Sequence, residues 1–254
     1  MDLFARQTWE NYDPAGLIAE RLKAIKSAIP ADVRTILDAG CGNGAITNAL
    51  EADYEILGVD FSPAALEHVR APKLLASVTD LPLDDGSFDL VMCNEVWEHL
   101  SSEDLHQAVA EAIRVTRRHL LVGVPYREQL EAGLIRCDAC AKVFHVYGHR
   151  QSFTRRKLDR LLGLPAVWHQ TLGPRQRRHN LPLLRFRQHS LGQWHHPAFP
   201  VSCPHCGNTE FPRKSSLLTK AVNALDRVRL TQPRYWLLSL YRLPGNFKSP
   251  KAAR

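Results

Sequence analysis

The sequence predicts an α/β fold in which a mainly parallel sheet carries helices on both faces. Short apolar stretches alternate with stretches of helical periodicity over roughly 120 residues, a pattern that is typical of parallel sheets. Glycines follow the first apolar stretch and an aspartate ends the second, at the edge where such sheets bind their ligands. The chain of 254 residues is long enough to bury a substantial core.

The first half of the chain supplies five predicted strands and the helices between them. Apolar residues at helical spacing predict a helix over residues 14–29, which Pro30 ends. The predicted strands that follow are RTILDAG, YEILGVDF, LLASVTDLP, FDLVMCN and HLLVGVP. GAITNALEA and PAALEHVR predict the first two connecting helices, and a further helix begins after SSED, before the fifth strand.

Beyond Pro125 the regular alternation stops. The pattern there predicts a helix over 150–163, a strand at AVWHQTLG, a helix near 216–229 and a closing strand at YWLLSLYRL. Two Cys-x-x-Cys pairs lie between these elements, in stretches with many Pro, His and Arg residues. We therefore predict a single domain over residues 1–254, with residues 127–215 as an embedded, loop-rich insertion.

Charge is distributed unevenly along the chain. Residues 1–145 hold 13 Lys and Arg against 23 Asp and Glu, a net charge of −10, whereas residues 146–254 hold 20 against 3, a net charge of +17. This asymmetry suggests an anionic partner for the C-terminal part: nucleic acid, a phospholipid surface, or a phosphorylated or acidic glycan substrate. The alternative is a basic face that only complements the acidic half. Aromatic residues among the arginines could stack on RNA bases, or could form the core of an irregular lobe.

A glycine-rich turn follows the first predicted strand. In LDAGCGNGAIT, Gly40, Gly42 and Gly44 let the backbone approach a ligand without a side-chain clash. Such a triplet alone also fits NAD or FAD. Asp60 ends the second strand, where a carboxylate can bind both hydroxyls of a ribose. Asp80 ends the third, where a carboxylate can accept from an adenine amino group.

With these motifs in this order, residues 34–126 resemble the class I S-adenosylmethionine-dependent methyltransferases. The resemblance implies a seven-stranded, Rossmann-like sheet with S-adenosylmethionine as the cofactor. It also implies that Asp38 helps to hold the methionine part of the cofactor, and that the segment VTDLP contacts the adenine. The cofactor-binding residues that it implies are Asp38, Gly40, Gly42, Gly44, Asp60, Phe61, Asp80, Leu81 and Asn94.

The stretch NEVWEHL follows the fourth predicted strand. On one helical turn, Glu95, Glu98 and His99 would share a face, and a divalent cation would relieve the repulsion between the two carboxylates. A further donor would come from His149 or, failing that, His145. The stretch is similar to that of the ubiquinone-pathway O-methyltransferases and the small-RNA 2′-O-methyltransferases, which implies that Glu95, Glu98, His99 and His149 hold a metal. In the alternative interpretation, the acids only cap a helix or shape the pocket.

The two Cys-x-x-Cys pairs predict a structural zinc site. Four thiolates in two tight turns match tetrahedral zinc, and the ligands would be Cys137, Cys140, Cys203 and Cys206. The zinc would pin the insertion over the active site and hold His145 and His149 in place. A redox-active pair is the alternative, but nothing around either pair resembles a thioredoxin unit.

The reaction that these features predict is direct transfer of an activated methyl group to a hydroxyl. Metal coordination would lower the pKa of the hydroxyl, and a histidine would take its proton; the candidate catalytic residues are Glu95, His99, His145 and His149. We predict O-methylation of a small-molecule, lipid-linked or glycan acceptor. The alternatives are an RNA methyltransferase that uses the basic C-terminal part, and a methyltransferase-like binding module that has lost catalysis.

The sequence also bears on where the protein acts. No apolar run approaches the length of a membrane span, and residues 1–14 lack the zones of a secretory signal. A cytoplasmic protein is therefore expected, and the closing strand with its basic flanks could touch a membrane surface.

Overall fold

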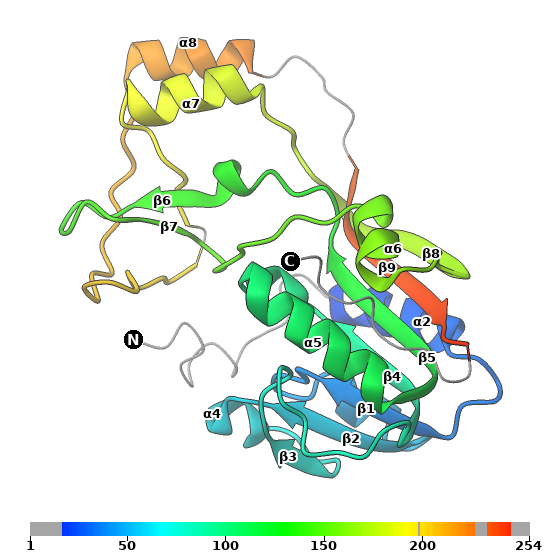
Figure 1. The fold of residues 1–254 in the computed structure, drawn as a ribbon. Coiled ribbons are helices and arrows are strands. Elements are labelled where there is room, and N and C mark those ends of the chain that lie inside the picture. Colours follow the sequence, from blue (N-terminus) through cyan, green and yellow to red (C-terminus); the bar gives the residue numbers. More distant parts are fainter. Residues whose placement is uncertain (1–16, 198, 227–232, 245–254) are drawn as a thin grey trace.

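A computed structural model describes residues 17–197, 199–226 and 233–244, and its main feature is one large sheet. The strands are β1 (Thr35–Ala39), β2 (Glu55–Asp60), β3 (Lys73–Leu75), β4 (Phe88–Asn94), β5 (Thr116–Pro125), β8 (Trp168–Arg175) and β9 (Arg234–Arg242). They form a seven-stranded sheet in the order β3-β2-β1-β4-β5-β9-β8 (Figure 1). Strands β1 to β5 are parallel, and β9 runs antiparallel to both β5 and β8. This confirms the predicted Rossmann-like sheet.

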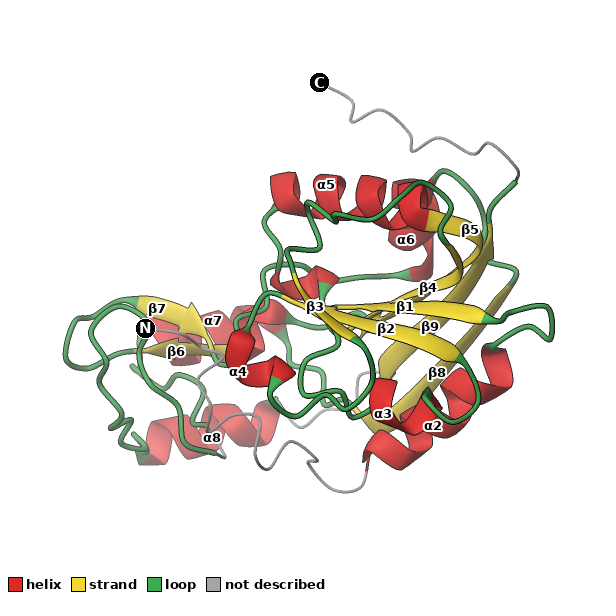
Figure 2. Cartoon of the chain, turned by 90° about the horizontal axis from the view of Figure 1, so that it is seen from below, coloured by secondary structure: helices red, strands yellow, loops and turns green. Residues whose placement is uncertain are grey.

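Helices cover both faces of the sheet, as predicted (Figure 2). They are α2 (Leu17–Ala28), α3 (Thr47–Leu50), α4 (Pro63–Leu66), α5 (Ser102–Val115) and α6 (Arg155–Leu162). One cluster of buried apolar residues joins α5 and α6 to the sheet, and another joins α2, α3 and α4 to its opposite face. Strand β4 and the part of β5 from Leu120 to Pro125 are mostly apolar because both of their faces are buried.

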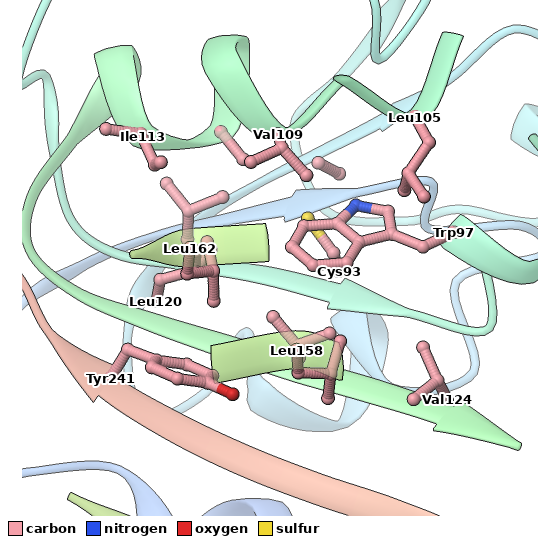
Figure 3. Close-up of a cluster of buried hydrophobic side chains, with 14 of the residues drawn as sticks. Cys93, Trp97, Leu105, Val109, Ile113, Leu120, Val124, Leu158, Leu162 and Tyr241 are labelled. Carbon is pink, nitrogen blue, oxygen red and sulfur yellow. The ribbon is translucent and has the colours of Figure 1, made fainter. Parts of the chain in front are cut away.

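The core under α5 and α6 is packed around Trp97 (Figure 3). Its ring is 1% exposed and belongs to the same cluster as Cys93 of β4 and Leu105 of α5. Tyr241 of β9 closes this core, and its hydroxyl donates to Oδ1 of Asp159 on α6 at 3.0 Å. Trp97 lies within the predicted metal-binding stretch, directly before Glu98, so this packing fixes the middle of that stretch to the core.

Several predicted elements are shorter than the sequence suggested, among them the helix at PAALEHVR, of which Pro63–Leu66 is helical, and the helix over 150–163, which is α6. The third strand ends at Leu75 instead of continuing through LLASVTDLP, because the backbone N–H of Asp80 donates to the carbonyl of Ser77 and turns the chain out of the sheet. Asp80 therefore lies in a loop beyond the strand. The helix predicted at GAITNALEA is the single turn α3.

The remaining described elements form a smaller lobe beside the sheet (Figure 1). They are η3 (Leu130–Gly133), β6 (Leu134–Arg136), β7 (Val143–His145), α7 (Leu181–His189) and α8 (Leu217–Leu225). We call residues 127–152 and 176–226 the cysteine lobe. The predicted insertion, 127–215, also includes α6 and β8, which belong to the main sheet and separate the two segments of the lobe. The predicted helix near 216–229 corresponds to α8. Residues 227–229 of that prediction lie outside the described ranges.

The lobe has its own small core. It consists of six buried residues: Ile135, Cys137, Phe144, Val146, Val201 and Cys203. Two of the six are cysteines, so little apolar surface holds this lobe together. Within the described ranges, no helix is both long enough and apolar enough to cross a membrane.

Candidate functional site

The glycine-rich turn after β1 requires glycine for two reasons. Gly40, Gly42 and Gly44 have φ angles of 84°, 55° and 74°, which other residues rarely adopt. Space is also limited, because a Cβ on Gly40 would lie 2.3 Å from Cγ2 of Val96. The turn therefore packs against the stretch after β4, and the two segments border the same site.

Hydrogen bonds join the loops at the ends of β1, β2 and β3. The backbone N–H of Gly42 donates to Oδ2 of Asp60 at 2.9 Å, and the N–H of Gly40 donates to the carbonyl of Val59 at 2.7 Å. On the other side, the N–H of Ala76 donates to the carbonyl of Asp60. The carboxyl ends of these parallel strands thus meet at one edge of the sheet, where ligands of this fold bind.

Two acids in this crevice are buried. Asp38 is 3% exposed, and burial raises its pKa to about 6 although Oδ2 accepts from the hydroxyl of Thr47 at 2.7 Å. Burial also raises the pKa of Asp60, although its carboxylate accepts from the N–H groups of Ser62 and Gly42. A cationic or multiply hydroxylated ligand would compensate for this desolvation.

The loop predicted to contact adenine is held by α5. The N–H of Leu81 donates to Oε2 of Glu111, and Nη2 of Arg114 donates to the carbonyl of Leu81. Leu81 is buried, whereas Asp80 is exposed and Phe61, beyond the end of β2, has 57% of its surface exposed. Glu111 and Arg114 position this loop, and sequence reasoning did not single them out.

The end of β4 carries polar groups without partners. Both side-chain amide atoms of Asn94 are buried without a hydrogen-bond partner in the described part of the chain, and a Cβ on Gly123 would lie 2.4 Å from Oδ1 of Asn94. Glu95 follows with a φ of 57°, and its N–H donates to the carbonyl of Gly123 at 2.8 Å. Glu95 therefore precedes the short helix η2 (Trp97–His99) and does not share a helical turn with Glu98 and His99, as the sequence had suggested.

Glu98 is the most unusual residue of the site. Its side chain is fully buried, and neither carboxyl oxygen has a hydrogen-bond partner within the described residues. Burial and then the nearby charge of Glu95 raise the pKa of Glu98 well above its ordinary value. A buried carboxyl group without partners is costly, so this arrangement favours a bound cation.

His149 lies beside Glu98 because the chain docks there. The N–H groups of Arg150 and Gln151 both donate to the carbonyl of Glu98, at 2.6 and 3.0 Å. Nδ1 of His149 is 2.6 Å from Oε2 of Glu128, which leaves Nε2 to offer a lone pair. Glu128 thereby orients the ring in the way that outer carboxylates orient metal-binding histidines.

The other two histidines differ in what they can do. His99 hydrogen-bonds to the backbone of Gly148, and burial lowers its pKa to about 3. Nδ1 of His145 accepts from the N–H groups of Tyr147 and His149, so the proton of its neutral ring is on Nε2, 3.6 Å from Oε1 of Glu128. His145 therefore holds the turn that carries His149, and it has no lone pair left for a metal.

The structure thus brings together part of the predicted metal site. Ligand atoms of Glu98, His99 and His149 lie within 4.8 Å of one another, and so do those of Glu128, His145 and His149. Glu95 is outside both groups, although its charge acts on Glu98. Glu128 was missed by sequence reasoning; its only signal was an acid three residues beyond the end of the fifth strand.

The four predicted zinc ligands also form one cluster. Their sulfur atoms lie within 4.8 Å of one another, with 3.6 Å between Sγ of Cys137 and Cys206 and 3.7 Å between Sγ of Cys140 and Cys203. Backbone N–H groups, that of Cys140 foremost, lower the pKa of the Cys137 thiol to about 7. Four converging sulfur atoms of this kind are the donor set that zinc prefers.

The fold and these loops define a nucleotide-type cofactor site in an α/β domain, and comparisons with known proteins narrow the class. Residues 37–120 match a family model described as a methyltransferase domain. The uncharacterized methyltransferase Rv3342 of Mycobacterium tuberculosis is 35% identical over 101 residues, which are 37% of this chain and 40% of that protein. Malonyl-[acyl-carrier protein] O-methyltransferase 1 of Coxiella burnetii is 32% identical over 113 residues, 42% of this chain and 39% of that protein.

A solved structure extends the likeness in fold. The chain is similar to the structure of an S-adenosylmethionine-dependent methyltransferase from Archaeoglobus fulgidus, with a TM-score of 0.58 and 15% identity. The match covers 95% of this chain and 100% of the solved chain. Residues 37–120 are therefore similar in sequence to methyltransferase domains, and the fold of the chain resembles that of a solved S-adenosylmethionine-dependent methyltransferase. The chain spans about two fifths of the length of the curated relatives that it matches, and the family match ends at residue 120, before the cysteine lobe.

Proposed function

We propose that this protein transfers the methyl group of S-adenosylmethionine to a hydroxyl oxygen that is held by a divalent cation at Glu98, His99 and His149. The observation that carries the proposal is the fully buried carboxyl group of Glu98, which has no hydrogen-bond partner among the residues that the structure describes and lies beside two histidines whose rings are already oriented. Two nitrogens and one carboxylate suit a divalent cation with open positions for a substrate. Glu95, which lies outside this ligand set, would take the proton of the hydroxyl, and S-adenosylhomocysteine would leave with the electron pair of the broken methyl–sulfur bond.

The cofactor would bind at the ends of β1, β2 and β3. Asp38 would hold the methionine ammonium, Asp60 the ribose hydroxyls, and the loop through Asp80 and Leu81 the adenine. Phe61, which is largely exposed, could cover the adenine ring. The cofactor supplies a methyl group on a positively charged sulfur, so the task of the protein is alignment of the acceptor with that group.

The residues that hold the cation would activate the acceptor hydroxyl. A bound divalent cation lowers the pKa of a coordinated hydroxyl. Glu98, His99 and His149 would hold the cation, and Glu128 would keep the His149 ring in its orientation through the bond to Nδ1. Burial of Glu98 and His149 would limit the access of water to the place of transfer.

The cysteine cluster would hold a structural zinc ion. The first cysteine pair lies in the turn between β6 and β7, and β7 leads directly to His145 and His149. Zinc bound there would stabilise the hairpin and so the histidine positions. Cysteines that bind zinc must stay reduced, which suits a reducing compartment such as the cytoplasm.

Binding of the cofactor tests the enzyme proposal against a catalytically inactive binding module. Calorimetry with S-adenosylmethionine should give one site per chain, and Asp60→Asn should weaken binding at least about tenfold, since it removes charge-assisted bonds to the ribose. Asp53→Asn, an exposed acid before β2, is the matched control. Absence of cofactor binding would contradict the proposed methyltransferase activity.

Metal content tests the cation separately. After loading with Co²⁺, elemental analysis should find two ions per chain, of which one gives the thiolate charge-transfer absorption of the cysteine site. Glu98→Gln should lose the other ion and keep the absorption, whereas Glu103→Gln, an exposed acid on α5, should keep both ions. Cofactor binding with only one ion in the wild type would remove the cation mechanism and leave the methyltransferase assignment intact.

A further inference from the structure

The cysteine lobe contains a cavity of about 530 Å³ that lies apart from the cofactor loops. Its walls include five cationic side chains and one carboxylate, that of Asp138; the cations are Arg136, Arg177, Arg187, Arg213 and Lys214. They come from β6, α7 and loops on either side, so the fold gathers them from separate parts of the chain. Small-molecule sites in proteins commonly have volumes of about 300–1,000 Å³.

Much of this positive charge is not neutralised by the protein. Asp138 pairs with Lys214 at 2.6 Å, and Asp226 lies 3.6 Å from Nη2 of Arg177. Across the described ranges, no ion pair involves Arg136, Arg187 or Arg213.

Arg187 illustrates the cost of this arrangement. Its Nη1 donates to Oδ1 of Asn223 at 2.7 Å, but its buried Nε has no hydrogen-bond partner within the described part of the chain. Burial lowers the pKa of the guanidinium; the charge of Asp226 opposes this effect, and the charge of Arg177 adds to it. A bound anion would relieve both effects, because it would supply an acceptor and a negative charge.

The chemistry of the walls favours phosphate over other anions. Planar guanidinium groups donate paired hydrogen bonds to phosphate oxygens, and several of them can surround one tetrahedral anion. Trp194, which also lines the cavity, offers an aromatic surface to the rest of a ligand. We propose that this cavity binds the phosphate group of a phosphorylated ligand through Arg136, Arg187 and Arg213.

The phosphate could belong to a soluble molecule or to a lipid headgroup. The second source is suggested by α8, which borders the cavity through Asn223 and exposes Leu217, Leu218 and Leu225 by 85%, 53% and 62%. Apolar side chains beside a basic cavity suit a membrane surface. Both sources present the same group to the arginines.

A single segment of chain separates the cavity from the cluster formed by Glu98, Glu128, His99, His145 and His149. Ala132 lines the cavity, and a Cβ on Gly133 would lie 2.3 Å from Nε2 of His145. Leu134 pairs with His145 in the hairpin, and its carbonyl accepts from the N–H of His195, another cavity residue. If the proposed function holds, the phosphate would anchor the acceptor; phosphate binding itself does not depend on that function.

Calorimetry on the zinc-loaded full chain with inorganic pyrophosphate tests the site. The wild type should bind one equivalent, and the double variant Arg136→Gln/Arg213→Gln, which changes two exposed side chains, should bind at least about tenfold more weakly. Arg187→Gln should weaken binding as well. The control is Arg185→Gln on the same helix, whose guanidinium pairs with Glu131 and does not line the cavity.

Vesicle sedimentation distinguishes the two sources. Vesicles of phosphatidylcholine with phosphatidic acid should bind the wild type more than the double variant if a headgroup enters the cavity, and phosphatidylcholine alone should bind neither. Loss of either pyrophosphate or vesicle binding in the double variant supports the proposal. Three results would overturn it. The wild type could bind neither pyrophosphate nor the vesicles, all variants could bind equally, or the protein could bind single-stranded RNA but neither pyrophosphate nor the vesicles.

Discussion

Folding and the proposed cofactor binding favour different protonation states of the Asp38 carboxyl group. Burial raises its pKa from an ordinary 3.8 to about 6, so the folded chain holds this proton more tightly than the unfolded chain. The stability that the group contributes is fully present below pH 3.8 and is lost as the pH rises through about 6. The cofactor ammonium, in contrast, needs the ionised form.

Asp38→Asn should therefore separate the two demands. Its free energy of unfolding at pH 7 should equal or exceed that of the wild type, by up to about 2 kcal/mol, because no buried charge forms. In the wild type, affinity for S-adenosylmethionine should fall about tenfold between pH 7 and pH 5, and the variant should bind weakly with a flatter profile. Urea unfolding and calorimetry measure these quantities. A wild-type affinity that is constant over this range would contradict the role of Asp38.

Gly40 and Gly86 allow a matched test of crowding at the cofactor turn. Both have positive φ angles, 84° and 61°, but a Cβ would meet Val96 only at Gly40, whereas Gly86 faces open space. Gly86→Ala should cost about 1 kcal/mol of unfolding free energy from backbone strain, and Gly40→Ala about 3 kcal/mol because the clash adds to it. Gly40→Ala should also abolish cofactor binding. Equal costs in urea unfolding would show that the turn can move away from Val96.

At the scale of elements, the two cysteine turns have the same backbone geometry. The N–H of Ala141 donates to the carbonyl of Cys137, and the N–H of Gly207 donates to that of Cys203, both at 2.9 Å. The fifth residue of each turn has a positive φ, 59° at Ala141 and 75° at Gly207. The first turn therefore carries strain that the second avoids, because alanine is disfavoured in this conformation.

Exchanging these residues should change zinc affinity in opposite directions. Ala141→Gly should raise the affinity about fivefold, since it relieves about 1 kcal/mol of strain that exists only in the folded turn, and Gly207→Ala should lower it by a similar factor. Competition with a zinc-binding dye measures both. If the two variants shift the affinity in the same direction, backbone strain is not what distinguishes the turns.

For the whole molecule, the sheet and the cysteine lobe should respond differently to loss of zinc. The sheet has two extensive apolar clusters, whereas the cluster in the lobe has six buried members among the described residues, two of them cysteines. Small cores of this kind rarely fold without a metal. Because Glu128, His145 and His149 belong to the lobe, unfolding of the lobe would also disrupt the proposed cation site.

A strong chelator should therefore unfold the lobe and spare the sheet. Hydrogen exchange should accelerate within residues 127–152 and 176–226, while affinity for S-adenosylmethionine should stay within about twofold of the untreated protein, because opening is local. The variant Cys137→Ser/Cys203→Ser should behave in the same way without chelator. Cofactor affinity that is lost together with the lobe would mean that the two parts fold as one unit.

Much of the cofactor half could be predicted because its signals are local. Strand and helix periodicity, the glycines of the turn after β1 and the acid at the end of β2 lie within short stretches, and the seven-stranded sheet was confirmed. The third strand was predicted too long because apolar periodicity cannot show that the backbone of Ser77 and the side chain of Glu111 pull the chain out of the sheet.

The sequence by itself determined the class of domain, the turn proposed to bind its cofactor and the pairing of four cysteines into one candidate zinc site. Only the tertiary structure decided which side chains surround Glu98, that Glu128 orients His149, that His145 has no lone pair for a metal, and that arginines from separate segments share a cavity. The physical reason is that backbone periodicity and turn chemistry act between neighbours in the chain. Desolvation, tautomer and charge at a site depend on contacts between residues that are distant in sequence.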